Sequence, residues 1–256
     1  MIHLRNTKFI ISCPARSGST MLLHLLRSNP AILCHGEVFG GERLGHVSGR
    51  YAVRRREEEG FEQALHALSR SDPKRFLYDI VFDPQGKKTC GFKFKTDESF
   101  SEGCSHIQEM IRADTDIKVL QLRRRNVLAQ FISHQVVLKQ TGVTLVMKEE
   151  DRPRVEPFRV DVEEALEYFR DVLGREARVA EEYPDHRRLL VDYEDLVQDG
   201  HPVREAIQRF LGVPVGALST GTKKILKRNE TLLENFDEIV GAILAQGLGE
   251  RAAVAT

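Results

Sequence analysis

The sequence has no tryptophan, few aromatic residues and no excess charge of either sign. Among 256 residues, 7% are aromatic, and 38 lysines and arginines balance 38 aspartates and glutamates. A chain without net charge has no overall field that would draw it to nucleic acid or to an anionic membrane. We therefore expect no nucleic-acid partner, and we expect any anion to be bound by a local group of basic side chains.

Long apolar runs and paired cysteines are also missing. No run approaches the roughly 18 apolar residues that cross a bilayer, and no signal-peptide pattern precedes the first predicted strand. The four cysteines show no Cys-x-x-Cys pair, which favours reduced core thiols over disulfides or a metal site. These absences predict a cytoplasmic protein with no transmembrane segment and no bound metal.

Strand and helix patterns alternate along the chain. Strands are expected over 8–13, 31–39, 89–95, 117–122 and 188–196, and helices over 20–28, 57–69, 102–113, 126–136, 161–182 and 202–212. This alternation is typical of a parallel sheet with helices on both faces, so we expect a single α/β domain of the P-loop type over 1–256. Segments 40–88 and 141–160 fit the pattern least, and we interpret them as insertions that bind an acceptor.

Three local patterns refine this prediction. The run RRREEE (54–59) is expected to start the second helix. Asp161 and Thr231, each followed by a glutamate three residues later, form capping-box patterns before the last two long helices. On strand 89–95, Phe92 and Phe94 alternate with Lys93 and Lys95. We expect both lysines on an exposed face, with the active site as the alternative position for one of them.

The stretch CPARSGST (13–20) joins the first strand to the first helix. Gly18 allows the backbone to approach an anion closely, and N–H groups at a helix start point into one cavity. Arg16 can bind two oxygens through its planar guanidinium. Further donors are the hydroxyls of Ser17, Ser19 and Thr20. The loop lacks the Gly-Lys-Ser/Thr of ATP and GTP sites, so it is expected to bind a different anion.

A second basic motif, LRRRNVLAQFISH (122–134), ends a buried strand with three arginines. Arg125 lies at the junction with the next helix, which Asn126 can cap. Ser133 follows Arg125 by eight residues and shares a polar stripe with Gln130. Ligands of parallel sheets sit beyond the carboxyl ends of the strands. Two anion sites at that edge therefore indicate one ligand with two separated phosphates.

These motifs resemble those of sulfotransferases that use 3′-phosphoadenosine 5′-phosphosulfate (PAPS). PARSGST is similar to their 5′-phosphosulfate loop, and RNVLAQFIS to their 3′-phosphate motif, with the same spacing of eight from arginine to serine. VDYEDL (191–196) and NFDEI (235–239) resemble landmarks of the bacterial carbohydrate branch, which sulfates trehalose, lipopolysaccharide or lipo-oligosaccharide. The resemblance extends from residue 8 to about residue 244.

The resemblance implies an enzyme that transfers a sulfuryl group in line, without a metal, from PAPS to a hydroxyl of a carbohydrate or glycoconjugate. The residues that it implies for PAPS binding are Arg16, Ser17, Gly18, Ser19, Thr20, Arg125 and Ser133. Many relatives close a late basic segment over the 3′-phosphate. Lys227 is the candidate here, with Lys224 and Arg228 as alternatives.

Sulfuryl transfer needs a cation near the leaving oxygen and a base for the acceptor proton. Arg16 takes the position where many relatives have a lysine. We favour Glu37 as the base, because similar enzymes use a glutamate in this neighbourhood. His35 is the alternative, because imidazole titrates near neutral pH.

Other functions stay open on the sequence alone. A P-loop kinase or NTPase would depend on magnesium, for which Asp192 is the nearest candidate ligand. A non-catalytic nucleotide-binding module would bind the nucleotide without turnover. The scarcity of aromatic residues favours a sugar over a tyrosine or phenol as acceptor. The identity of the acceptor and the oligomeric state, with a homodimer as one option, are not determined.

Overall fold

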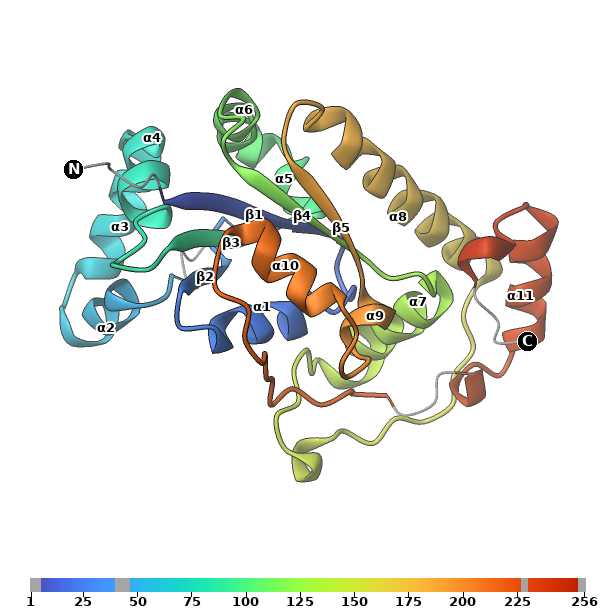
Figure 1. Cartoon of the computed structure of the whole chain (residues 1–256). Coiled ribbons are helices and arrows are strands. Elements are labelled where there is room, and N and C mark those ends of the chain that lie inside the picture. Colours follow the sequence, from blue (N-terminus) through green and yellow to red (C-terminus); the bar gives the residue numbers. More distant parts are fainter. Residues whose placement is uncertain (1–5, 40–46, 227–229, 253–256) are drawn as a thin grey trace.

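The computed structural model describes residues 6–39, 47–226 and 230–252. Within these ranges, five strands form one parallel sheet in the order β2-β3-β1-β4-β5 (Figure 1). The strands are β1 (Thr7–Cys13), β2 (Ile32–Glu37), β3 (Thr89–Lys95), β4 (Lys118–Arg123) and β5 (Arg188–Asp192). They confirm the predicted α/β class. The fifth strand ends earlier than expected, because Tyr193–Leu196 form a short helix, α9.

Helices cover both faces of this sheet, as predicted (Figure 1). The α-helices that the structure describes besides α9 are α1 (Ser19–Ser28), α2 (Arg50–Glu57), α3 (Phe61–Ser71), α4 (Pro73–Arg75), α5 (Thr96–Ser99), α6 (Ser105–Ala113), α7 (Val127–Val136), α8 (Val162–Glu182), α10 (Val203–Leu211) and α11 (Phe236–Ala245). Short π-helical or 3₁₀ turns are η1 (Phe76–Val81), η2 (Glu102–Cys104), η3 (Val137–Thr141), η4 (Glu149–Asp151), η5 (Glu230–Leu232) and η6 (Gly249–Arg251).

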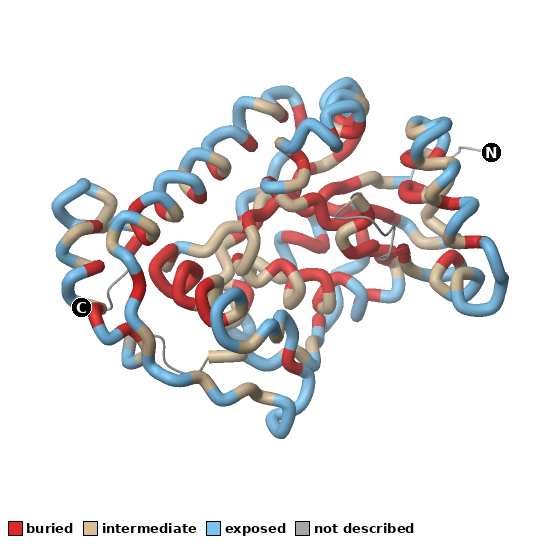
Figure 2. Tube along the Cα trace, turned by 180° about the vertical axis from the view of Figure 1, so that it is seen from behind, coloured by how far each residue is buried: buried red, intermediate tan, exposed pale blue. Residues whose placement is uncertain are grey.

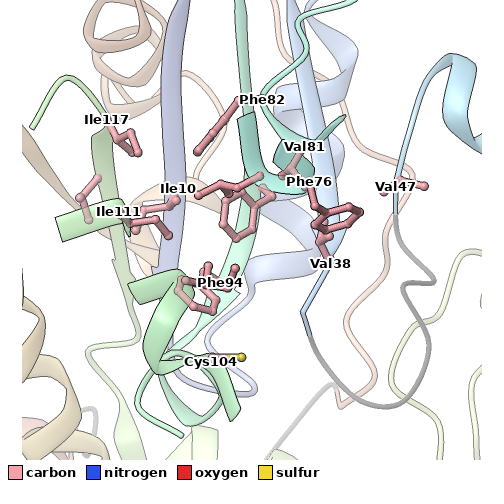
Figure 3. Packing of buried hydrophobic residues seen from close by; sticks show 14 of the residues in the cluster. Ile10, Val38, Val47, Phe76, Val81, Phe82, Phe94, Cys104, Ile111 and Ile117 are labelled. Carbon is pink, nitrogen blue, oxygen red and sulfur yellow. The ribbon is translucent and has the colours of Figure 1, made fainter. Parts of the chain in front are cut away.

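Alternation along the strands divides the core between the two faces. Phe9 and Ile11 of β1 pack with Leu22 of α1 and Ile207 of α10. Ile10, between them in sequence, belongs to the cluster on the opposite face, and Figure 3 shows it close to residues of η1 and α6. Buried residues follow the sheet and the inner sides of its helices (Figure 2). The period of two in the strands therefore accounts for a core on each side.

A third cluster lies beside the sheet and joins α7, α8 and α11. Phe131 of α7 packs with Phe169 of α8 and with Ile239 and Ile243 of α11. The late helix α11 is thereby held against α8, which also packs on α7 (Figure 1). Segments distant in sequence thus meet near the carboxyl end of the sheet.

The structure corrects two predicted helix starts. RRREEE does not begin a helix, because α2 ends at Glu57 and Gly60, with φ of 79°, separates it from α3. A left-handed residue breaks the helical path, and glycine adopts it at little cost. The Thr231 capping box is also wrong, since α11 begins at Phe236. By contrast, Asp161 caps α8 as expected, accepting from the N–H groups of residues 163 and 164.

Two further findings concern the cysteines and the helices. All four cysteines are free and buried, as the sequence predicts. Among the described helices, none combines the length and the apolar character needed to cross a membrane.

Candidate active site

The loop after β1 turns sharply to start α1. Arg16 and Gly18 both have left-handed φ angles, of 59° and 91°. A Cβ atom on Gly18 would lie 2.2 Å from Cδ2 of Tyr193, so only glycine fits this position. No side chain caps α1, and its first turn faces a cavity. The first N–H groups of a helix lack partners within the helix, so they are available to an anion there.

Arg16 joins the first predicted motif to the second. Its Nε and Nη2 donate to Oγ of Ser133 at 3.2 and 3.1 Å, and its Nη1 donates to the main-chain oxygen of Thr144 at 3.2 Å. Burial lowers the pKa of Arg16, and the nearby guanidinium of Arg124 lowers it further. Two residues that the sequence assigned to separate phosphate sites are therefore in direct contact.

Arg124, and not Arg125, enters the cavity. The guanidinium of Arg124 lies over the ring of Tyr193, 5.0 Å from its centroid, and its buried Nε has no hydrogen-bond partner among the described residues. Arg125 is exposed and turned away, with Nη2 donating to Asp195 at 2.7 Å and Nη1 to Asp192 at 3.3 Å. The predicted Arg125 is thus already paired, whereas its neighbour lines the cavity and has a buried Nε without a partner among the described residues.

The VDYEDL segment holds the loop that carries these arginines. Asp192 accepts from Nε of Arg123 at 2.6 Å. The carboxylate of Glu194 accepts from the main-chain N–H groups of Arg125, at 3.0 Å, and of Asn126, at 3.2 Å. Asn126 in turn caps α7, as predicted, by accepting from the N–H of Ala129. Asp192, the candidate magnesium ligand, therefore serves as an ion-pair partner of arginines.

The cavity between these elements has a volume of about 310 Å³. One wall is formed by the first loop, α1, Arg124 and Tyr193. The other is formed by residues 144–145 and 222–226, whose segments are joined where the N–H of Lys223 donates to the main-chain oxygen of Val146 at 2.8 Å. Its basic side chains are Arg16, Arg124, Lys223 and Lys224, and no aspartate or glutamate of the described chain lines it. Such a cavity favours an anion.

Of the other residues predicted for nucleotide binding, Ser19 and Thr20 line this cavity and Ser17 does not. The hydroxyl of Ser17 is fully buried and donates to the main-chain oxygen of Pro14 at 2.8 Å, so it stabilises the turn. Lys227 and Arg228 lie outside the described residues, whereas Lys224 is exposed on the cavity wall.

Glu37 forms a charged cluster at the ends of β2 and β3. Its Oε1 lies 2.5 Å from Nζ of Lys93, and its Oε2 lies 2.9 Å from Nζ of Lys95. Burial alone would raise the pKa of Glu37, but the two lysines outweigh it and lower the pKa. Lys93 is only 5% exposed, so the prediction that these lysines lie on an exposed face is wrong.

Cys13 connects this cluster to the first loop. Burial raises the pKa of its thiol to about 11, while Lys93 opposes the shift and hydrogen bonds to Ser19 and Ser17 also lower it. The charge of Glu37 acts on the same thiol. Glu37 itself is not among the described residues that line the cavity, and β3 separates its strand from β1.

His35 occupies a different environment from Glu37. It is fully buried, its Nδ1 accepts from the N–H of Ser48 at 2.7 Å, and its Nε2 lies 3.8 Å from Sγ of Cys90. Burial lowers the pKa of His35 to about 4, so the ring is neutral. These contacts do not fit the alternative role of catalytic base.

Glu98 was not found from the sequence. Its Oε1 lies 3.0 Å from Nζ of Lys95, while its buried Oε2 has no hydrogen-bond partner within the described ranges. Burial raises the pKa of this carboxyl to about 6, against the opposing charge of Lys95. The only signal in the sequence was its position three residues beyond a lysine at a strand end. Across the residues that the structure describes, no three His, Cys, Asp or Glu side chains are grouped to hold a metal ion.

Comparisons with known proteins identify the family and the fold. A family model described as the sulfotransferase family matches residues 9–216. The chain is 26% identical over 240 residues to nodulation protein H of Rhizobium meliloti, covering 90% of this chain and 89% of that protein. It is 25% identical over 237 residues to nodulation protein H of Rhizobium tropici, with coverages of 90% and 87%. The structure of a sulfotransferase from Alicyclobacillus acidocaldarius superposes with a TM-score of 0.53 at 19% identity, covering 97% of this chain and 94% of that one.

Proposed function

The chain belongs to the sulfotransferase family, and from this premise we propose that it transfers a sulfuryl group from PAPS to a hydroxyl of a carbohydrate or glycoconjugate. The observation that carries the proposal is the basic cavity at the carboxyl edge of the sheet. There the start of α1, Arg16 with Ser133, and Arg124 converge without an opposing carboxylate in the described lining.

The 5′-phosphosulfate is assigned to the first loop. The N–H groups at the start of α1 and the hydroxyls of Ser19 and Thr20 face the cavity, and Arg16 can donate two parallel hydrogen bonds. Arg16 now donates to the neutral hydroxyl of Ser133, a weaker partner than an anion. A bound phosphosulfate therefore offers it a better acceptor.

The 3′-phosphate is assigned to Ser133 together with Arg124, in place of Arg125. Arg124 is half-buried in the cavity and has an Nε without a partner in the described chain, whereas Arg125 would have to leave three carboxylates. Lys224 completes the basic wall, and Lys227 stays a prediction.

In the reaction, an acceptor oxygen attacks sulfur while the bond from sulfur to the bridging oxygen breaks. Negative charge grows on that oxygen, and Arg16 and the α1 N–H groups stabilise it. The acceptor hydroxyl loses its proton, and Glu37 receives it. The two lysines keep Glu37 ionised and oriented at neutral pH, as a base must be before it takes the proton.

A carbohydrate-type acceptor is supported by the relatives named as nodulation proteins and by the low aromatic content. The free, buried state of all four cysteines supports a cytoplasmic location. Residues 144–145, within one segment predicted to bind the acceptor, line the nucleotide cavity.

Calorimetric titration with adenosine 3′,5′-bisphosphate (PAP), in the absence of metal, tests the nucleotide assignment. We expect a dissociation constant of about 10 μM or tighter, corresponding to roughly 7 kcal/mol, and no comparable binding of Mg-ATP. Tight binding of Mg-ATP with no binding of PAP would contradict the proposal.

A further inference from the structure

The C-terminal turn of the described chain contacts the arginine loop. Arg251, in η6, donates from Nη2 to the main-chain oxygen of Arg124 at 2.9 Å and from Nε to that of Arg125 at 3.3 Å. It lies 127 residues after Arg124. Two consecutive carbonyl groups of the loop thus share one guanidinium as their donor.

Glu176 of α8 fixes the direction of Arg251. The two side chains form a pair of parallel contacts, from Nη1 to Oε2 at 2.8 Å and from Nη2 to Oε1 at 3.1 Å. Glu176 is 8% exposed, and burial raises its pKa although Arg251 opposes the shift. A bidentate pair with a nearly buried carboxylate has little freedom to turn.

The loop is therefore held through its main chain from two sides. Glu194 accepts from the N–H groups of Arg125 and Asn126, while Arg251 donates to the oxygens of Arg124 and Arg125. Arg124 lines the cavity, whereas Arg125 pairs with carboxylates outside its lining, so the path of the main chain decides which guanidinium enters the cavity. The guanidinium of Arg124 forms no ion pair within the described residues. Outside the cavity it could be hydrated or pair with a carboxylate, so its position in the cavity needs a structural support.

We propose that Arg251 is a positioning residue of the nucleotide site, which holds the loop so that Arg124 points at the 3′-phosphate. The inference rests on the proposed function, because the ligand is the adenine nucleotide. The turn at 249–251 thereby supports a site whose lining comes in part from the first loop, the loop after β4 and α9.

The test measures the binding of PAP and of 5′-AMP, which lacks the 3′-phosphate, by calorimetry. Arg251→Ala should weaken the binding of PAP about tenfold and the binding of AMP less than about twofold. The reason is that only the contact to the 3′-phosphate depends on Arg124. Arg251→Lys keeps one charged donor and should recover about half of the loss on a logarithmic scale. Equal weakening of both nucleotides would overturn the inference, since it would report general damage.

A second variant separates positioning from the stability of the buried carboxylate. Arg251→Ala leaves Glu176 buried without a partner, which lowers thermal stability by itself. The double variant Arg251→Met with Glu176→Gln removes that charge. We expect its melting temperature to return toward that of the unmodified protein while its PAP affinity stays about tenfold weaker. Recovery of PAP binding in this double variant would overturn the inference.

Arg159→Ala is the matched control. Arg159 forms an ion pair with Glu238 of α11 at 2.6 Å, so it ties the same C-terminal region without touching the loop. Its removal should change the PAP affinity less than about twofold. An effect as large as that of Arg251→Ala would also overturn the inference. Absence of PAP binding by the unmodified protein would instead reject the proposed function, and this inference with it.

Discussion

The two halves of the carboxyl edge are built in different ways. On the nucleotide side, main-chain groups are held by distant side chains, as Glu194 and Arg251 hold the arginine loop. On the side where we propose that the acceptor reacts, called the acceptor side below, Glu37, Lys93, Lys95 and Glu98 contact one another through charged side-chain atoms. On the nucleotide side one partner of each contact is a main-chain group that does not titrate, whereas on the acceptor side both partners are carboxyl or amino groups that bind protons.

The two halves also differ in the balance of basic and acidic side chains. The nucleotide cavity has basic side chains and no acidic ones in its described lining, as a multiply charged phosphate requires. The Glu37 cluster balances lysines with carboxylates. The first half is thus suited to hold an anion and the second to move a proton. Substitutions in the two halves should therefore separate binding from turnover.

The largest effect is expected for Glu37→Gln. The amide cannot accept the acceptor proton, so turnover should fall about 100-fold or more, while PAP affinity should change less than about twofold. Turnover is measured as release of PAP from PAPS in the presence of a panel of oligosaccharides. PAP affinity is measured by calorimetry. The exposed Glu57→Gln is the control. Turnover that survives in Glu37→Gln would remove this residue from the role of base.

The next effect distinguishes two adjacent arginines. Arg124→Ala should weaken PAP roughly 10- to 150-fold, because a hydrogen bond to a charged group contributes about 1.5–3 kcal/mol. Arg125→Ala removes the ion pairs of an exposed arginine with Asp192, Glu194 and Asp195, and it should weaken PAP binding by about threefold at most. Titration of both variants under the same conditions decides the assignment. The reverse order would return the 3′-phosphate to Arg125.

A pH profile tests the acceptor side. The lysines hold the pKa of Glu37 below its ordinary value, so its ionised form is present above that pKa and is lost as the pH falls through it. Lys95→Met removes one opposing charge and should move the acidic limb of kcat/KM to higher pH. The exposed Lys74→Met is the control. An unshifted limb would show that Glu37 does not set this ionisation.

The smallest effect is expected at the cavity wall. Lys224 is exposed, and Lys224→Ala should weaken PAP by about threefold at low salt. The difference should shrink at about 0.5 M salt, because screening acts on exposed charges. Calorimetry at the two salt concentrations measures the loss of PAP affinity and its dependence on salt. A salt-independent loss of tenfold or more would mean that Lys224 forms a desolvated contact with the phosphate.

Local sequence was sufficient for most of the fold and for the first loop. Period-two and helical patterns predicted all five strands and the class, and the small residues around Gly18 predicted the turn. These features depend on neighbours in the chain, which a sequence displays directly. The same holds for the Asn126 cap, because its side chain accepts from the N–H of Ala129, only three residues later in the sequence.

The choice between similar neighbours was decided by tertiary structure. Within three consecutive arginines, the contacts of Glu194 and Arg251 determine which one enters the cavity, and both come from distant segments. Between His35 and Glu37, the register of β2 on β3 shifts by one residue. Such a bulge reverses which face a side chain takes. His35 therefore enters the core beside Cys90, while Glu37 meets Lys93 and Lys95, because pairing partners on another strand set the path of β2.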